Sequence, residues 1–311
     1  MSDLPAIRAA YLADAATQPV LAEELARLGV GVSHWHWHGL LALSPEPPVA
    51  SAWALDVWTA PELAACASVG DAARILRDRQ RNWSLHSAVQ HRRCALIQAK
   101  LPPVKAAPLR FPAPAPQAPL GAWTLLASDR LLFSATKSSP FVGGACRFVE
   151  DRAGPPSRAY LKFWEACMRV GEHPAAGQAC LDLGAAPGGW SWALAQLGAQ
   201  VVAVDKADLA ASVAAMPNVR FRRESAFALD PATEPAVDWL CSDVIAYPAR
   251  LLALVTRWIE AGKAARILCT IKFQGPTDHD IADRFALIPG ARLMHLAHNK
   301  HELTFFWSAP T

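Results

Sequence analysis

The sequence lacks the features that mark several classes of protein. Only 18% of its 311 residues are charged and 52% are hydrophobic, so we expect a chain with a sizeable core rather than a disordered one. No run of about 18 apolar residues indicates a transmembrane helix. The N-terminus has an early acidic residue, Asp3, and lacks the basic start of a secretion signal. We therefore predict a cytoplasmic chain of roughly two domains with no membrane partner.

Closely spaced cysteines are also missing. The seven cysteines form no CxxC pair that could bind zinc and no dense disulfide framework. We expect them to be reduced, mostly buried and inert. They are Cys66, Cys94, Cys146, Cys167, Cys180, Cys241 and Cys269.

Three histidines, His34, His36 and His38, alternate with Trp35 and Trp37. On a strand, alternate residues share one face, so the three imidazoles would point the same way. Imidazole is a common metal ligand, but no carboxylate or thiol lies nearby in the sequence, and a polar strand face also explains the pattern. We predict no metal site here and core packing for the tryptophans, although stacking of the tryptophans on a ligand stays open.

The net charge of +3 is small, but the basic residues are unevenly distributed. RILRDRQRNW (74–83) and QHRRC (90–94) gather arginines around Trp83. Basic side chains beside an aromatic ring suit an RNA backbone. A solvated helix face explains the same pattern.

Proline divides the chain. LPPVKAAPLRFPAPAPQAPLG (101–121) cannot form the interior of a helix or a central strand and predicts a connector. Upstream, the apolar pattern predicts strands at 7–14, 33–44 and 51–58 and a helix at 17–30. We therefore expect a small α+β module in 1–100, a connector with remaining strands in 101–155, and a second domain in 156–311.

The second domain has the pattern of an α/β fold. Short apolar runs at 179–183, 200–204, 237–243 and 265–273 alternate with helical stretches, including 157–171 and 249–261. This alternation predicts a mostly parallel sheet covered on both faces. Residues 291–307 predict an antiparallel hairpin that turns near Asn299 and Lys300. A mostly parallel sheet ending in such a hairpin is the Rossmann-like outline of class I methyltransferases.

A glycine-rich turn follows the first strand of this domain. Gly184, Gly188 and Gly189 lack side chains, so the backbone can approach a ligand closely at the start of a helix. Asp205 ends the next strand, where a carboxylate can accept the two ribose hydroxyls of a nucleoside. The turn therefore predicts a cofactor that contains adenosine.

Two nucleotide-binding motifs are absent from the same turn. Ala186 and Pro187 occupy the middle of the loop, so the GxGxxG grip on a pyrophosphate is not reproduced, and no P-loop lysine follows. S-adenosylmethionine contains ribose and adenine but no phosphate. We therefore predict S-adenosylmethionine as the cofactor.

The stretch DLGAAPGGW followed by VVAVD resembles the FtsJ-type RNA 2′-O-ribose methyltransferases. Four further stretches are similar to those that carry the Lys-Asp-Lys-Glu tetrad of that family: PSRAYLK (156–162), CSD (241–243), TIKF (270–273) and HNKHELT (298–304). The resemblance implies a tetrad of Lys162, Asp243, Lys272 and Glu302. It also implies that Ala186, Pro187, Gly188, Gly189, Asp205 and Asp243 bind the cofactor.

The resemblance leaves one contact open and suggests a substrate. Ser225 stands where the family commonly has an aspartate that meets the adenine amino group, and either Ser225 or Glu224 could replace it. Within the family, the resemblance is closest to enzymes that methylate a cytidine ribose of 23S ribosomal RNA. Those enzymes carry ferredoxin-like and THUMP-type RNA-binding units upstream. The shorter N-terminal region here implies a reduced version of them.

The chemistry of ribose methylation explains why such a tetrad is useful. A ribose hydroxyl is a poor nucleophile at neutral pH, so methyl transfer needs a positioned base. A lysine can be that base only if its pKa falls, and we expect Lys162 and Lys272 to lower each other's pKa through proximity and burial. Asp243 and Glu302 would balance the charge and hold the amines in place. The resemblance implies Lys272 as the proton acceptor.

We therefore expect a monomeric, S-adenosylmethionine-dependent RNA 2′-O-methyltransferase that acts on ribosomal RNA. One alternative is a methyltransferase for a small molecule or a protein, which leaves the paired lysines without a purpose. The other alternative is a catalytically silent RNA-binding protein that keeps the fold, which would be free to lose Lys272.

Overall fold

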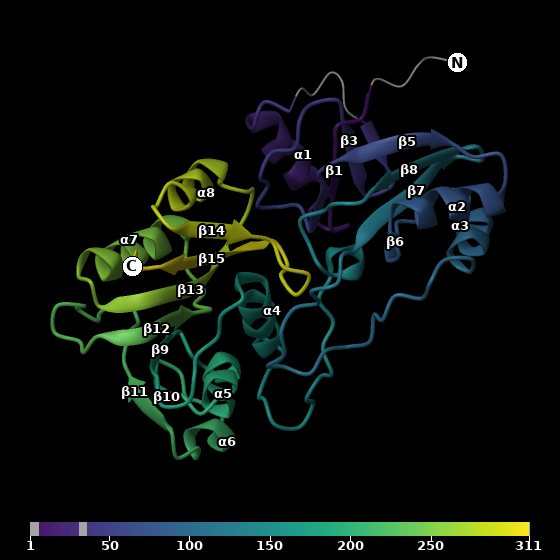
Figure 1. The fold of residues 1–311 in the computed structure, drawn as a ribbon. Helices are drawn as coiled ribbons and strands as arrows, with labels where there is room; N and C mark the ends of the chain where they lie inside the picture. The colour runs from purple at the N-terminus through teal and green to yellow at the C-terminus, as the bar shows by residue number, and fades with distance from the viewer. Residues whose placement is uncertain (1–5, 31–35, 311) are drawn as a thin grey trace. The chain divides into compact units, whose positions relative to one another are not determined.

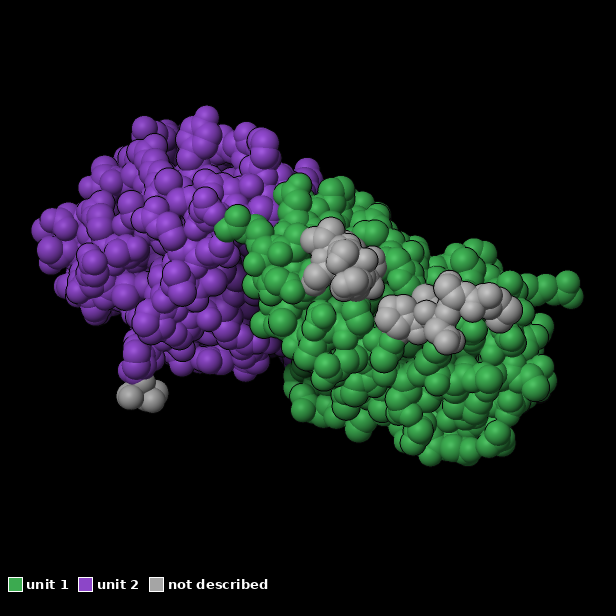
Figure 2. All heavy atoms as spheres, turned by 90° about the horizontal axis from the view of Figure 1, so that it is seen from above, with its two compact units in different colours: residues 1–109, 114–147 green, residues 110–113, 148–311 purple. Residues whose placement is uncertain are grey.

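The computed structural model describes residues 6–30 and 36–310. The chain forms two compact units, which Figure 2 draws in separate colours. Unit 1 comprises residues 1–109 and 114–147, and unit 2 comprises residues 110–113 and 148–311. Part of the proline-rich connector therefore belongs to unit 2, where Phe111 stacks on Trp164 with ring centroids 5.2 Å apart.

Unit 1 is built on two sheets (Figure 1). Among the described residues, one sheet has the order β2-β3-β1-β4 and the other has the order β5-β8-β7-β6. The strands of the first sheet are β1 (Ala9–Leu12), β2 (His36–His38), β3 (Leu41–Ser44) and β4 (Asp56–Trp58). The strands of the second are β5 (Pro61–Ala65), β6 (Trp83–Leu85), β7 (Gly121–Ala127) and β8 (Arg130–Ser134). The helices are α1 (Gln18–Arg27), α2 (Val69–Arg79) and α3 (His91–Gln98), with a 3-10 turn η1 at Val142–Gly144.

Buried apolar side chains join the elements of unit 1. Trp58 of β4 and Leu132 of β8 share one core cluster with residues of β1 and β3. Trp83 and Phe133 anchor a second cluster under α2 and α3, with their rings edge to face at 5.8 Å. The helix predicted at 17–30 is confirmed as α1. The interpretation of the arginine-rich stretches as helix faces holds for part of them, because 74–79 and 91–94 lie on helices.

The strand predicted at 33–44 is wrong as one continuous strand. Gly39 has a φ of +61°, a left-handed conformation that favours glycine, and the chain reverses there between β2 and β3. His34 lies outside the described residues. The Nε2 atom of His38 lies 3.3 Å from the Thr124 hydroxyl, and the described part of the chain holds no cluster of three or more potential metal ligands.

Unit 2 is an α/β unit with one seven-stranded sheet in the described residues. The strand order is β11-β10-β9-β12-β13-β15-β14, and β15 is antiparallel to both of its neighbours. The strands are β9 (Ala179–Leu183), β10 (Gln200–Asp205), β11 (Val219–Arg223), β12 (Val237–Ser242), β13 (Ala264–Lys272), β14 (Ala291–Met294) and β15 (Glu302–Ser308). This order and the reversed β15 confirm the class I methyltransferase fold.

Helices cover both faces of this sheet. Figure 1 shows α4, α5 and α6 on one face and α7 and α8 on the other. Their bounds are α4 (Tyr160–Val170), α5 (Gly189–Gln196), α6 (Ala211–Ala214), α7 (Pro248–Glu260) and α8 (His279–Ala286). The predicted hairpin is confirmed as β14 and β15, although its connection, 295–301, is longer than the short turn we expected.

The strand order places the chemistry-bearing residues at one edge. From β9 the strands follow in chain order to β10 and β11 on one side, and the chain then returns to add β12 and β13 on the other side of β9. Open α/β sheets bind ligands beyond the carboxyl ends of the strands at such a switch point. Gly184 follows β9, Asp205 ends β10, Asp243 follows β12 and Lys272 ends β13. The fold therefore brings these four residues to the same edge.

The cysteines are buried, as we expected. All seven cysteines lie in the described residues, where each is buried and none forms a disulfide. Burial raises the pKa of the Cys180 thiol to about 12, so this thiol is not reactive at neutral pH. Within the described ranges, none of the helices combines the length and the apolar character that crossing a bilayer needs.

Candidate active site

A cavity of about 440 Å³ opens at the carboxyl edge of the sheet in unit 2. Its volume lies in the range of small-molecule sites. The glycine-rich loop after β9 forms one wall, and the segment after β12 forms another. The lining residues are Ser157, Ala159, Asp182, Gly184, Ala185, Ala186, Pro187, Gly189, Trp190, Asp205, Asp243, Val244, Ile245 and Lys272.

A smaller cavity of about 200 Å³ adjoins the first and shares Gly184, Asp205 and Val244 with it. Ser225 lines this cavity, together with Phe227 and Arg250, whose guanidinium lies 3.9 Å from the centroid of the Phe227 ring. The carboxylate of the alternative residue, Glu224, accepts a bond from the Arg222 Nε at 2.6 Å. Ser225 is therefore better placed than Glu224 to meet a ligand.

Asp205 connects the glycine-rich loop to the cavities. Its Oδ2 accepts the Ala186 backbone N–H at 3.0 Å, and its Oδ1 accepts the Ala207 backbone N–H at 2.9 Å. These two bonds fix the carboxylate at the boundary of the two cavities. Carboxylate oxygens accept more than one bond each, so Asp205 keeps the capacity to accept ribose hydroxyls.

The glycines of the loop have different roles. Gly188 does not line the cavity. It is the residue before α5, it has a φ of +113°, and a Cβ there would lie 3.0 Å from a Val213 methyl group. Gly184 lines both cavities with a φ of +77°, and a Cβ there would lie 2.6 Å from the Val244 Cβ and 2.8 Å from the Val244 Cα.

Gly184→Ala is expected to destabilise the loop more than Gly171→Ala does. Gly171 ends α4 with a similar φ of +82°, but nothing lies within 4 Å of a Cβ there. Both variants bear the left-handed backbone cost of about 1–2 kcal/mol, and only Gly184→Ala adds a collision with the Val244 backbone. Urea unfolding and calorimetric titration of the cofactor measure the effects. Equal losses of stability and cofactor affinity in the two variants would contradict this account.

Asp182 is a buried carboxyl that sequence reasoning did not select. It lies on β9, lines the larger cavity, and its Oδ2 accepts the Ser191 hydroxyl at 2.6 Å. Its Oδ1 is buried without a hydrogen-bond partner. Burial, reinforced by the charges of Asp243 and Asp205 and opposed by Ser191, raises the pKa of Asp182 to about 7. A cationic group in the cavity would satisfy this oxygen.

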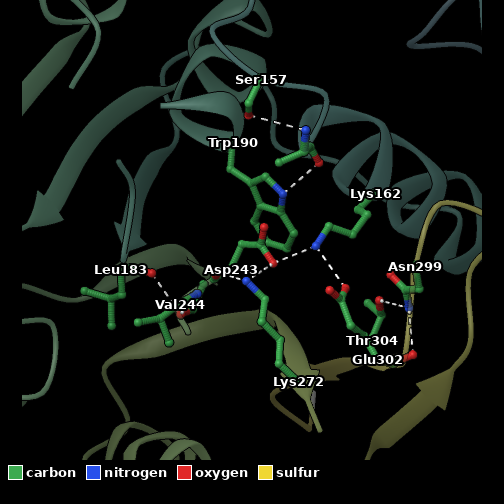
Figure 3. A network of polar contacts seen from close by, with 12 residues as sticks. Ser157, Lys162, Leu183, Trp190, Asp243, Val244, Lys272, Asn299, Glu302 and Thr304 are labelled. Atoms are coloured by element: carbon green, nitrogen blue, oxygen red, sulfur yellow. Dashed lines mark hydrogen bonds and ion pairs between the residues drawn. The ribbon is translucent and has the colours of Figure 1, made fainter. Parts of the chain in front are cut away.

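The predicted tetrad residues converge beside this cavity (Figure 3). The Lys162 Nζ lies 2.9 Å from Asp243 Oδ1 and 2.9 Å from Glu302 Oε2. The Lys272 Nζ lies 3.0 Å from the same Asp243 Oδ1 and also donates to the Asp243 backbone carbonyl. Asp243 therefore bridges the two amines, and all four side chains are largely buried.

The two lysines differ in their surroundings. Burial by itself would lower the pKa of the Lys162 amine. The negative charges of Asp243 and Glu302 have the opposite and larger effect, so the pKa of Lys162 is raised. The expectation that the paired lysines lower each other's pKa is therefore wrong for Lys162. Lys162 therefore stays protonated at neutral pH. Within the described residues, Lys272 pairs with Asp243 and, unlike Lys162, lines the larger cavity, so its amine is the one that faces a ligand there.

A second buried network holds the loop before Glu302. Glu165 lies one turn after Lys162 on α4, and its side chain has no exposed area. Its carboxylate accepts the backbone N–H groups of Ala297 and His298 at 3.1 Å each. His298 Nδ1 and Arg169 Nε lie 2.7 and 2.9 Å from the carboxylate oxygens. The helix that carries Lys162 therefore also positions the loop that leads to Glu302.

The structure groups the predicted residues into two sets. Gly184, Ala186, Pro187, Gly189 and Asp205 line the larger cavity, and Ser225 lines the smaller one. Asp243 and Lys272 line the larger cavity and also belong to the predicted tetrad. The other two members of the tetrad, Lys162 and Glu302, pair with each other and do not line the cavity. Sequence reasoning missed Asp182, Trp190 and Glu165. Only Asp182, just before the glycine-rich turn, carried a usable signal, an acidic residue inside an apolar strand.

The comparisons with known proteins find similar proteins for part of the chain. Residues 155–276 match the FtsJ-like methyltransferase family. Ribosomal RNA large subunit methyltransferase M of Halorhodospira halophila is 41% identical over 120 residues, which cover 38% of this chain and 35% of that protein. Its counterpart from Alkalilimnicola ehrlichii is 37% identical over 186 residues, which cover 56% of this chain and 51% of that protein. The matches thus span about half the length of these relatives or less.

One solved structure, TrmN from Thermus thermophilus, is similar over 97% of this chain and 99% of that chain, with 15% identity and a TM-score of 0.37. This similarity is too low to support a conclusion about function.

The residues present fit S-adenosylmethionine. Asp205 lies between the cavities, where the ribose hydroxyls of the cofactor need acceptors. Asp182 has an unpaired buried oxygen that suits the ammonium group of the methionine part. Ser225 would hold the adenine end, and the glycine-rich loop leaves room for the backbone to approach. Residues 155–276 of unit 2 are therefore similar to the FtsJ-like methyltransferases, and S-adenosylmethionine is the cofactor that the cavities fit.

Proposed function

We propose that this chain methylates the ribose 2′-hydroxyl of an RNA nucleotide, with Lys272 as the proton acceptor. The observation that carries the proposal is the convergence of Lys162, Asp243, Lys272 and Glu302 beside the cofactor cavity. A methyltransferase for an already strong nucleophile has no use for two buried lysines at this place. A ribose hydroxyl, in contrast, needs a base.

The four side chains then have separate roles. S-adenosylmethionine supplies a methyl group activated by a sulfonium. The neutral form of the Lys272 amine takes the proton of the hydroxyl and becomes an ammonium as the new oxygen–carbon bond forms and the carbon–sulfur bond breaks. Asp243 holds that amine through the contact at 3.0 Å. Lys162 stays charged between Asp243 and Glu302 and keeps both carboxylates in place.

The substrate class rests on the relatives. They are called large subunit ribosomal RNA methyltransferases, and this supports ribosomal RNA as the substrate. A cytidine of 23S RNA as the specific target is our proposal from the sequence resemblance. We further propose that the region 1–100 and the strands of 101–155 form a reduced RNA-binding region. The cytoplasmic location and the monomeric state stay predictions.

Ribosomal RNA from cells with and without the gene tests this function. We expect one 2′-O-methylated cytidine of the large subunit RNA to lose its methyl group when the gene is deleted and to regain it with the wild-type gene. A gene that encodes Lys272→Ala serves as the matched control and should not restore the methyl group. An unchanged methylation map of ribosomal RNA would contradict the substrate assignment.

The two alternatives predict different results in the same cells. A silent RNA-binding protein would leave all methyl groups unchanged while the chain still associates with RNA. A methyltransferase for a small molecule or a protein would transfer the methyl group of the cofactor to a product that ribonuclease does not degrade. Neither alternative accounts for the bridging of Lys162 and Lys272 by Asp243.

A further inference from the structure

A second cavity, of about 410 Å³, lies entirely within unit 1. Its walls come from the segment before β6, from two parts of the proline-rich connector, and from the segment around η1. The lining residues are Arg81, Asn82, Pro103, Val104, Lys105, Ala106, Ala107, Leu109, Pro116, Gln117, Ala118, Leu120, Pro140, Phe141, Val142, Ala145 and Arg147. None of them belongs to the candidate active site.

Hydrogen bonds hold the walls of this cavity in place. The Asn82 Nδ2 donates to the Pro119 carbonyl at 3.1 Å, so the segment before β6 is fixed to the end of the connector. The Leu109 backbone N–H donates to the Arg147 carbonyl at 2.8 Å, so the start of the connector is fixed to the segment after η1. Proline restricts the backbone between these points. The cavity is therefore formed before any ligand arrives.

The charges around the cavity all have one sign. Arg81, Lys105 and Arg147 are exposed, and within the described residues their side chains form no hydrogen bond or ion pair. No aspartate or glutamate lines the cavity. Three unpaired cations with no local acid create a positive potential that favours an anionic ligand.

The rest of the lining is apolar or carries amides. Val104, Val142 and Pro116 offer apolar surface, and Val142 is 37% exposed. Asn82 and Gln117, whose side chains end in amides, also line the cavity. Unpaired bases need a surface on which to lie and polar groups at their edges, while the phosphates between them need cations. A single-stranded polynucleotide has all three requirements, and a duplex hides its bases from such a cavity.

We propose that this cavity binds a single-stranded segment of RNA, with the bases against the apolar wall and the phosphates beside Arg81, Lys105 and Arg147. The inference rests on the proposed function, because it identifies the ligand as part of the RNA that unit 2 methylates. It extends that function by giving unit 1 a defined binding site, which includes Arg81 and Asn82 from the end of the arginine-rich stretch 74–83.

The test uses the full-length chain with Arg81, Lys105 and Arg147 all replaced by alanine. Fluorescence anisotropy with a single-stranded RNA of about 12 nucleotides measures the affinity at several salt concentrations. We expect the affinity to fall by about tenfold or more and the slope of log Kd against log salt to fall by about 2, since each lost phosphate contact contributes roughly 0.7. All three residues are exposed, so the variant should fold, which circular dichroism checks.

The control replaces Arg152, Arg220 and Arg284 with alanine. These residues of unit 2 are also exposed and line neither this cavity nor those of the candidate active site, so the loss of charge is the same. The control should bind RNA like the wild type. An equal loss in both variants would overturn the proposal in favour of general attraction to a basic surface, and an unchanged affinity in the cavity variant would overturn it outright.

A competition experiment separates an RNA segment from a mononucleotide. We expect cytidine monophosphate to displace the labelled RNA only at concentrations far above those at which unlabelled RNA does so. Displacement at equal concentrations would overturn the proposal and indicate a nucleotide site. If instead RNA binds at the cavity but no ribose is methylated, the proposed function fails while this inference stands.

Discussion

Replacement of Lys272 by alanine is expected to lower the rate of methyl transfer to RNA by about 100- to 10,000-fold, the usual contribution of a positioned base. The cause is the loss of the proton acceptor, since the Lys162 amine is kept protonated by Asp243 and Glu302. Single-turnover transfer from labelled S-adenosylmethionine measures the rate. The cofactor affinity, measured by calorimetry, should change far less.

Lys272→Arg separates proton transfer from simple electrostatic attraction. Arginine keeps the positive charge but does not lose its proton in proteins. We therefore expect Lys272→Arg to be nearly as slow as Lys272→Ala. Lys263→Arg is the matched control, because Lys263 precedes the same strand, β13, at the opposite end. A fast Lys272→Arg variant would show that charge at this position is sufficient and would refute the role of Lys272 as base.

Glu165→Gln is expected to destabilise the fold strongly. It removes the charge from a carboxylate with no exposed area and breaks the ion pair of that carboxylate with Arg169. Breaking a buried ion pair from one side costs about 3–5 kcal/mol. Urea unfolding measures this loss, and methyl transfer should slow as well because the loop before Glu302 loses its anchor.

Acid should affect the same contact. Burial by itself would raise the pKa of the Glu165 carboxyl. The hydrogen bond from His298 and the positive charge of Arg169 have the opposite and larger effect, so the pKa of Glu165 is lowered in the folded chain. The contribution of Glu165 to stability is therefore complete above its unfolded pKa of about 4.3 and is lost as the pH falls through the folded pKa. The difference in the free energy of unfolding between the wild type and Glu165→Gln should therefore shrink as the pH falls from the unfolded pKa to below the folded pKa of Glu165.

Glu172→Gln provides the control for this prediction. Glu172 pairs with Arg266 at 2.6 Å, but both side chains are partly exposed. Exposed ion pairs contribute about 0–1 kcal/mol, so this variant should unfold like the wild type. If Glu165→Gln is no less stable than Glu172→Gln, the network around Glu165 does not hold the loop.

The α/β unit could be predicted well because its signals are local. Each buried parallel strand is a continuous apolar run, and the glycine-rich loop and Asp205 keep a spacing that one supersecondary unit imposes. The tetrad residues could be selected by resemblance, yet their geometry could not. Lys162 and Glu302 are 140 positions apart, and only the folded sheet brings them within 2.9 Å.

The features that sequence reasoning missed depend on long-range packing. Glu165 in the sequence is an ordinary acidic residue of a helix, and only the hairpin loop packed against α4 buries it. The strand β5 has a largely exposed pattern and carries no apolar alternation. The proline-rich connector was interpreted as a link between domains, whereas it also forms walls of the cavity in unit 1.

The position of the transferred methyl group distinguishes methylation of a sugar hydroxyl from methylation of a base. Purified chain, large subunit ribosomal RNA that lacks the modification, and labelled S-adenosylmethionine are incubated, and the RNA is digested to nucleosides and separated by mass. We expect label on the 2′-oxygen of a cytidine ribose, and labelling about 100- to 10,000-fold slower with Lys272→Ala. Label on a base, or equal label on the ribose with Lys272→Ala, would contradict the activation of a sugar hydroxyl by this tetrad.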